Sequence, residues 1–367
     1  MDPRLENRLD FVDLLKAIAI YFVVLYHFYF VSEDFLSESN PVVFANYYIK
    51  SLLSTCVPVF FFVNGLLLLK KKEIDVIRHA KKVLRICILT VVWSFITLGS
   101  LSLLRNESLS ISQLIMNVHI SLRMHWNNHL WFLGTIVVIY IFYPFIHLAY
   151  YKSKPVFYFF FISILLFTFG RTFLDGLFST ISYFSNRFTT VDFDFNYGGI
   201  FNPVQGIHGY ALVYFMLGGI LFEKASVLNS KKYKNLSMIG ILLSTLLLFL
   251  YGIIYSHRTG VIWDSVWNGY DTVFTLLNVC FLFVMVIGYR SKGRIGYFIG
   301  LIGQNSLGIY LIHILVLELF RPWYFRFEIP AVLWVNILYA FCVLLISLGL
   351  TLFFLRIPLL KELFRFG

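Results

Sequence analysis

The sequence predicts an all-α polytopic membrane protein, and three observations lead to this fold class. Of the 367 residues, 59% are hydrophobic and only 13% are charged, whereas an average soluble domain is about 25% charged. The apolar residues gather in runs of about 18 or more, which is long enough for a helix to cross a ~30 Å hydrocarbon core. The runs lack the alternation of barrel strands, so helices must satisfy the backbone polar groups in lipid.

Ten such runs follow one another along the chain, and each is expected to form one transmembrane helix. In order they are Phe11–Val31, Ile49–Leu69, Val83–Leu104, Leu130–Tyr150, Val156–Phe173, Ile207–Phe222, Leu236–Tyr255, Thr272–Tyr289, Ser306–Phe320 and Ala331–Leu355. The stretch Gly296–Gln304 is expected either to extend the ninth helix or to lie along the membrane surface. Residues 1–367 are expected to form one transmembrane domain without a fused extracytoplasmic domain.

The charged loops predict how these helices are oriented. With both the N- and the C-terminus in the cytosol, the inner segments carry 22 of the 30 Lys and Arg residues and the outer segments carry the other 8. Cytosolic loops of membrane proteins are enriched in Lys and Arg, so this bias supports cytosolic termini. The net charge of +11 follows from this topology. Because the charges are scattered over six short segments, the expected partners are membrane lipids and no nucleic acid.

The cysteines predict neither disulfides nor a metal site. Cys56, Cys87, Cys280 and Cys342 all sit in apolar runs without paired spacing, whereas zinc sites and disulfide frameworks have characteristic spacings. No metal ion is therefore expected. The first apolar run lacks a small-residue cleavage site, so it is expected to be a retained helix and not a signal peptide.

The first helix carries polar residues at membrane depth. Lys16 and His27 are eleven residues apart, which places them on one face about 16 Å apart along the helix axis. Buried polar residues in a membrane are costly and often functional. The alternative is that Lys16 extends to the inner headgroups and His27 bonds to a neighbouring helix. The shared face, with Asp13 three residues before Lys16, favours a functional role.

A basic cluster lies at the inner end of the third helix. Lys82 and Arg85 are three residues apart on one helical face, and Arg78 precedes them by one turn. Such cations suit the phosphates of a cytosolic, nucleotide-bearing donor. The alternative is a topology signal or a contact with anionic lipid.

Two further groups of polar residues lie at or within the apolar runs. Asn128 and His129 adjoin Trp131 at the outer entry to the fourth helix, and polar groups beside aromatic faces suit a sugar, although outer Trp residues usually belong to the aromatic belt. Tyr310 and His313 share one face of the ninth helix, where a satisfied core histidine is the alternative. The outer loops, residues 105–129 and 171–206, are expected to be either a substrate vestibule or solvated connectors.

Taken in order, these motifs resemble the acyltransferase-3 family of bacterial integral membrane acyltransferases over nearly the whole chain. The segments that carry the resemblance are Arg8–Ala19 followed by Tyr26-His27, Val57–Gly65 with its Pro58 and Asn64-Gly65, Lys82–Arg85, His129–Leu133, Tyr214–Gly218 and Asn305–His313. The family's basic-x10-His pattern falls on Lys16 and His27, and its basic-x-x-Arg pattern falls on Lys82 and Arg85.

The resemblance implies an O-acetyltransferase of the bacterial cell (inner, cytoplasmic) membrane. Family members typically transfer acetyl from cytosolic acetyl-CoA to a hydroxyl of a sugar or glycan, often beyond the membrane. Polysaccharide-synthesis machinery is an implied partner. Two departures from the family pattern are seen. Asn64 stands where many members have Ser, which is a modest change. Many members also carry a Glu a few residues after the Trp of the fourth helix, and the residues from Gly134 onward supply none; this puts a role for an acidic group there in doubt and points to the shorter, exopolysaccharide-type branch. Without the esterase-like domain of some members, the chain is expected to complete the transfer alone or pass the acyl group to a partner.

The combined hypothesis gives each group of residues a role. His27 is expected to be the base or the transient acyl carrier, and Lys16 and Asp13 are expected to be further catalytic residues. Lys82, Arg85, Lys16 and Arg78 are expected to bind the donor. Asn128, His129, Trp131, Tyr310 and His313 are expected to bind the acceptor. Succinyl transfer, a transporter or exporter of a glycan or small solute, and a non-catalytic scaffold are the alternatives, although the paired broken helices of transporters are not seen.

Overall fold

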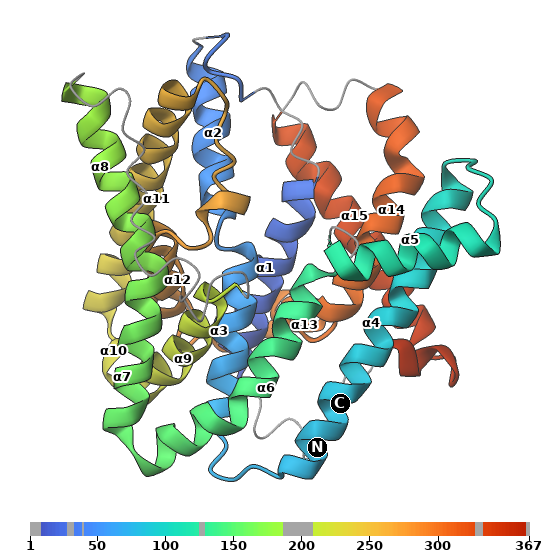
Figure 1. The fold of residues 1–367 in the computed structure, drawn as a ribbon, viewed down its shortest axis with the longest axis horizontal. Helices are drawn as coiled ribbons and strands as arrows, with labels where there is room; N and C mark the ends of the chain where they lie inside the picture. Colours follow the sequence, from blue (N-terminus) through green and yellow to red (C-terminus); the bar gives the residue numbers. More distant parts are fainter. Residues whose placement is uncertain are drawn as a thin grey trace.

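The computed structural model describes residues 9–27, 33–38, 40–124, 129–185, 208–326 and 333–364, and all regular structure in these ranges is helical (Figure 1). The all-α prediction is confirmed. The α-helices are α1 (Asp10–His27), α2 (Pro41–Leu53), α3 (Cys56–Leu69), α4 (Val76–Leu104), α5 (Ile111–Met124), α6 (Trp131–Lys152), α7 (Lys154–Leu165), α8 (Arg171–Ser185), α9 (Tyr210–Glu223), α10 (Ala225–Leu228), α11 (Lys231–Thr259), α12 (Val273–Val286), α13 (Gly293–Gln304), α14 (Ser306–Arg326) and α15 (Leu333–Phe354). A π-helical segment, η1 (Leu166–Gly170), and two 3₁₀ turns, η3 (Trp267–Gly269) and η5 (Leu360–Phe364), complete the regular structure.

The chain is a multi-pass membrane protein. Within the described ranges, seven helical stretches are long and apolar enough to cross a membrane, namely Pro41–Leu69, Val76–Leu104, Trp131–Lys152, Lys154–Ser185, Lys231–Thr259, Ser306–Arg326 and Leu333–Phe354. The other three expected spans fall on α1, α9 and α12. The helices α9 and α12 are apolar but shorter, and α1 carries Asp10, Asp13 and Lys16 within its 18 residues.

The helix connections at the two ends of the bundle agree with the prediction that basic loops lie on one side of the membrane and the other loops on the opposite side. In Figure 1 the α3–α4 and α6–α7 connections lie at the bottom, whereas α2 begins, and α8 and α14 end, at the top. Two of the basic segments predicted to be cytosolic, residues 70–85 and 152–154, therefore share the bottom end of this view.

Two regions expected to be outer loops contain helices instead. The helix α5 occupies residues 111–124, and α8 continues past the expected end of the fifth span at Phe173 to Ser185. Both are amphipathic and neither is apolar enough to resemble a span alone. Val118, for example, is buried, whereas most of the other described side chains of α5 are exposed. The candidate vestibule residues Asp192, Asp194, Asn196, Gly198 and Gly199 lie outside the described residues.

The stretch Gly296–Gln304 does not continue the ninth span. It belongs to α13, which ends at Gln304. Asn305 alone separates α13 from α14, which begins at Ser306. The helix α13 packs along α1, and a Cβ atom at Gly303 would overlap the backbone of Asp13. Close backbone approach of this kind requires glycine.

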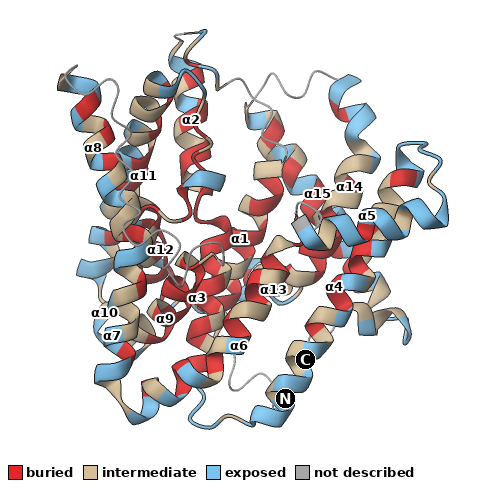
Figure 2. Ribbon diagram, viewed as in Figure 1, coloured by how far each residue is buried: buried red, intermediate tan, exposed pale blue. Residues whose placement is uncertain are grey.

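The core of the protein surrounds α3. In the most apolar part of Pro41–Leu69, 78% of residues are buried inside the protein, against 22% for Lys154–Ser185, and Figure 2 shows the buried residues concentrated in α1, α3 and α9. Gly65 of α3 faces the backbone of Phe215, and Gly218 of α9 faces that of Phe62. These two glycines let the helices touch backbone to backbone, as small residues do between membrane helices.

Candidate active site

A cavity of about 690 Å³ brings together the cations predicted to bind the donor. Lys16 of α1 and Lys82 and Arg85 of α4 all line it, and apolar side chains of α3, α6 and α14 form much of the remaining wall. Arg78 lies in the first turn of α4, is exposed and is not part of this lining. Three of the four cations that were predicted to bind the donor therefore line one cavity, which we call the donor cavity.

Lys82 is positioned by a short chain of contacts across the donor cavity. Its Nζ lies 5.1 Å from the centre of the Tyr140 ring. The Tyr140 hydroxyl donates to Oδ1 of Asn64 at 2.9 Å, and the Asn64 amide donates to the Phe60 carbonyl at 2.9 Å. Asn64 thus fixes the ring beneath the ammonium group.

Arg85 has an acidic partner that the sequence analysis did not identify. Its Nη2 lies 2.6 Å from Oε2 of Glu362, with side-chain exposures of 38% and 52%. Glu362 belongs to η5, which is held against α4 by a 2.9 Å hydrogen bond from Nε1 of Trp93 to the Leu363 carbonyl. Because both charges remain partly exposed, an anionic ligand in the donor cavity would compete with Glu362 for Arg85.

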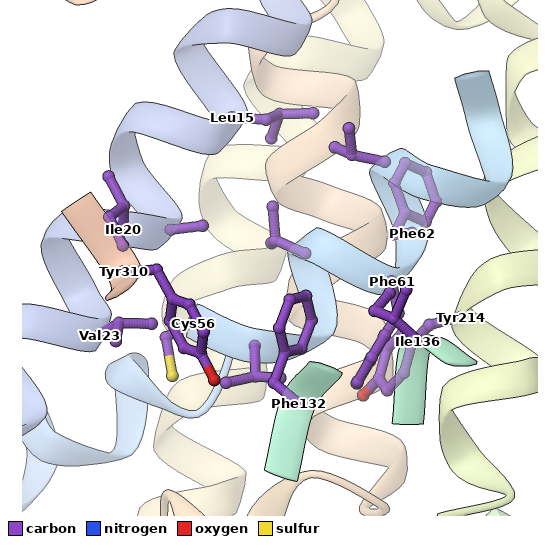
Figure 3. Close-up of a cluster of buried hydrophobic side chains, with 14 of the residues drawn as sticks. Leu15, Ile20, Val23, Cys56, Phe61, Phe62, Phe132, Ile136, Tyr214 and Tyr310 are labelled. Atoms are coloured by element: carbon purple, nitrogen blue, oxygen red, sulfur yellow. The ribbon is translucent and has the colours of Figure 1, made fainter. Parts of the chain in front are cut away.

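His27 lines a second cavity, of about 210 Å³, which we call the middle cavity. His129, Trp131 and Tyr310 line it as well. Val23, Val57, Phe132 and Tyr310 line both the donor and the middle cavity, and Figure 3 shows Val23, Phe132 and Tyr310 in this region. The two cavities therefore adjoin, with His27 beyond the shared wall.

His27 of α1 and His129, which precedes α6, line the middle cavity, and His313 of α14 is buried beside them. The ring centres of His27 and His313 are 5.2 Å apart, and those of His129 and His313 are 6.0 Å apart. The Tyr310 hydroxyl donates to the backbone carbonyl of His129. Within the described part of the chain, no group of three or more His, Cys, Asp and Glu side chains has the arrangement of a metal site.

The hydrogen bonding of His313 assigns its tautomer. Its Nδ1 lies 2.6 Å from the carbonyl oxygen of Tyr310, and since a carbonyl can only accept, Nδ1 carries the proton. In the neutral ring Nε2 is then an acceptor. This atom is buried and has no hydrogen-bond partner among the described residues, so the residue presents an acceptor nitrogen in the histidine cluster.

A partly buried ionic network lies next to His27. The Tyr26 hydroxyl donates to Oδ2 of Asp264 at 2.7 Å, and Nζ of Lys50 lies 2.5 Å from Glu33 and 3.7 Å from Asp264. Burial raises the pKa of the Glu33 carboxyl, and the Lys50 ammonium opposes that shift. The sequence analysis missed this network, because its residues are scattered along the chain and no spacing links them.

A third cavity, of about 440 Å³, adjoins the middle cavity and shares none of its described lining residues with the donor cavity. Trp267 and Tyr270 line both. Trp131 packs against these two rings, with centres 5.0 Å from Trp267 and 6.0 Å from Tyr270. The three cavities therefore form a row through the bundle, with His27 at the middle one.

The remaining predicted residues fall in different places. Asp13 is buried at the α1–α13 contact and lines none of the three cavities. His313 is fully buried beside His27. Asn128 lies outside the described residues.

A family model of an acyltransferase domain, of the acyltransferase-3 type, matches residues 9–356. Neither a curated protein nor a solved structure matches the chain significantly.

Proposed function

The chain belongs to the acyltransferase-3 family, and from this premise we propose that it is a membrane O-acyltransferase for a sugar hydroxyl. The acyl group would be acetyl, the donor acetyl-CoA from the cytosol, and the acceptor a cell-surface glycan. The observation that carries the proposal is the row of three cavities, with Lys82 and Arg85 at one end and His27 in the middle. The location would be the bacterial cytoplasmic membrane, beside polysaccharide-synthesis machinery.

The donor cavity suits an acyl-CoA in both charge and shape. Lys82, Arg85 and Lys16 supply three cations for the phosphates, and Arg85 can bind phosphate through two parallel hydrogen bonds. The mainly apolar wall beyond them suits the pantetheine arm, which would carry the thioester toward the wall shared with the middle cavity.

His27 can serve acetyl transfer in either of two ways. As a base, it takes the acceptor's hydroxyl proton while the oxygen attacks the thioester carbonyl; the C–S bond breaks and the leaving thiolate takes up that proton. As a carrier, its nitrogen attacks the carbonyl and releases the CoA thiol. The acceptor oxygen then displaces the imidazole, which takes up the hydroxyl proton. Both routes end with an ester on the sugar and free CoA.

Acetyl-CoA binding to purified protein in detergent, followed by calorimetry, tests the donor half of this proposal. Wild type is expected to bind saturably, and Arg85→Ala is expected to bind more weakly. Arg294→Ala is the matched control, because Arg294 is an exposed residue of α13 outside the donor cavity, and it should bind as wild type does. Absence of binding at millimolar acetyl-CoA, from protein shown to be folded, would contradict the proposal; tighter binding of succinyl-CoA would reassign the donor.

A further inference from the structure

The third cavity has the volume and the walls of a small-molecule site. At about 440 Å³ it falls within the ~300–1,000 Å³ typical of such sites. Its lining comes from α8, the start of α9, α11 and the loop around η3, and it combines aromatic rings with charged and amide groups. Of the residues predicted from the sequence to bind the acceptor, none of the four that the structure describes, His129, Trp131, Tyr310 and His313, lines it.

Aromatic rings form one wall of this cavity. The Trp263 ring lies 5.1 Å from Tyr251 at 89° and 6.0 Å from Tyr255 at 49°, measured between ring centres. Trp267 is 46% exposed and stands at the border with the middle cavity. Aromatic faces carry partial negative charge, so they attract the C–H groups on one face of a sugar ring.

Planar polar groups lie among these rings. Asp271 accepts a 3.1 Å hydrogen bond from the Thr172 hydroxyl, and a carboxylate has room for about three more. Asn268 and Arg171 also line the cavity. Nε of Arg171 is buried and has no hydrogen-bond partner within the described part of the chain. Fixed planar donors and acceptors of this kind suit pairs of neighbouring hydroxyl groups.

The charge of the lining discriminates between classes of sugar. Its described residues include two carboxylates, Asp175 and Asp271, and one guanidinium, Arg171. Burial raises the pKa of Asp271, because desolvation disfavours its charged form. A uronic acid or sugar phosphate would add like charge beside these carboxylates, whereas a neutral ring would not.

We propose that the third cavity is the acceptor site and that it binds a neutral glycosyl ring, with Trp267 and Trp263 against the ring and Asp271 bonded to its hydroxyls. This inference rests on the proposed function, since it names the acceptor of the same reaction. The shared lining residues Trp267 and Tyr270 let a hydroxyl at the edge of the bound ring point into the middle cavity, where His27 lies.

The test is sugar binding without any donor. Saturation-transfer NMR would be recorded on the purified protein with methyl glycosides of glucose, galactose, mannose and rhamnose, and with methyl glucuronide. At least one neutral glycoside is expected to bind, and methyl glucuronide at least tenfold more weakly. Both Asp271→Asn and Trp267→Leu are expected to weaken binding of the neutral glycoside by about tenfold.

Matched controls separate loss of the site from loss of the fold. Asp34→Asn changes an exposed carboxylate of the loop before α2, and Trp334→Leu changes a tryptophan of α15 that is 64% exposed; neither lines the cavity, so both should bind as wild type does. The inference fails if no neutral glycoside binds at tens of millimolar, if methyl glucuronide binds more tightly, or if Asp271→Asn binds normally. Continued acetyl-CoA binding by the same preparation would show that the proposed function survives that failure. Glycoside binding without acetyl-CoA binding would show that the third cavity binds a sugar and that the proposed donor is wrong.

Discussion

The Tyr26 hydroxyl donates a 2.7 Å hydrogen bond to Oδ2 of Asp264, a residue 238 positions further along the chain. The other carboxylate oxygen accepts hydrogen bonds from the backbone amides of Val266 and Trp267 at 3.0 and 3.2 Å. The Asp264 carboxylate therefore positions both Tyr26, the residue next to His27, and Trp267, which lines both the middle and the third cavity.

Removing the Tyr26 hydroxyl should slow acyl transfer without weakening donor binding. A hydrogen bond to a charged group is worth about 1.5–3 kcal/mol, so Tyr26→Phe is expected to lower the transfer rate by about tenfold or more, with unchanged acetyl-CoA affinity. Tyr21→Phe is the control on the same helix, because its hydroxyl bonds to the Ile337 carbonyl at 2.9 Å. Equal transfer rates in the two variants would contradict a positioning role for Tyr26.

Glu362 should restrain donor binding, because its carboxylate occupies Arg85. Glu362→Gln removes the competing charge, and we expect acetyl-CoA to bind several-fold more tightly, with the largest gain at low salt where screening is weak. Glu318→Gln is the control, since Glu318 pairs with Arg105 at 2.9 Å and neither residue lines the donor cavity. Calorimetry at two salt concentrations measures the effect; weaker binding in Glu362→Gln would show that Glu362 supports the site.

His313 should act through His27 by offering an acceptor nitrogen. His313→Asn keeps a donor for the Tyr310 carbonyl and an acceptor, whereas His313→Leu keeps neither, so the Asn variant is expected to retain at least tenfold more transfer activity. Thermal unfolding of both variants provides the control for folding. If both variants unfold at the same temperature and are equally inactive, the Asn side chain does not replace His313, and this would contradict a role for His313 through its acceptor nitrogen.

The close contact of α3 with α9 predicts a difference between two glycine substitutions. A Cβ at Gly65 would overlap the Phe215 backbone, whereas one at Gly349 in α15 would meet nothing within 4 Å. Overpacking a core costs about 1–3 kcal/mol, so Gly65→Ala should lower the unfolding temperature. Gly349→Ala should leave the unfolding temperature unchanged or raise it slightly, because replacing glycine by alanine where there is space stabilises a protein by a few tenths of a kcal/mol. The two melting curves test this, and equal shifts would argue against backbone contact at Gly65.

The sequence predicted what depends on local spacing. Apolar runs identified the spans because hydropathy acts within one helix. Lys82 and Arg85 met at one cavity because residues three apart share a helical face. The same regularity placed Lys16 on the donor cavity and His27 on the next one.

What the sequence did not predict depends on contacts between distant segments. Asp264 lies in a short loop without a motif, and only the fold brings it to Tyr26. The third cavity is built from α8, α9, α11 and the η3 loop, so no single stretch of sequence contains its pattern. The helices α5 and α8 were missed because an amphipathic helix lacks the uniform apolarity that marks a span.

The central claim is that His27 performs the transfer from a cytosolic donor, and labelled acetyl-CoA tests it directly. Inside-out membrane vesicles containing equal amounts of wild type or His27→Ala would receive acetyl-CoA labelled in the acetyl group, and label in the glycan fraction would be counted. We expect incorporation by wild type and only background in His27→Ala, with acetyl-CoA affinity unchanged within about twofold because His27 lies outside the donor cavity. Wild-type incorporation by His27→Ala would contradict the account.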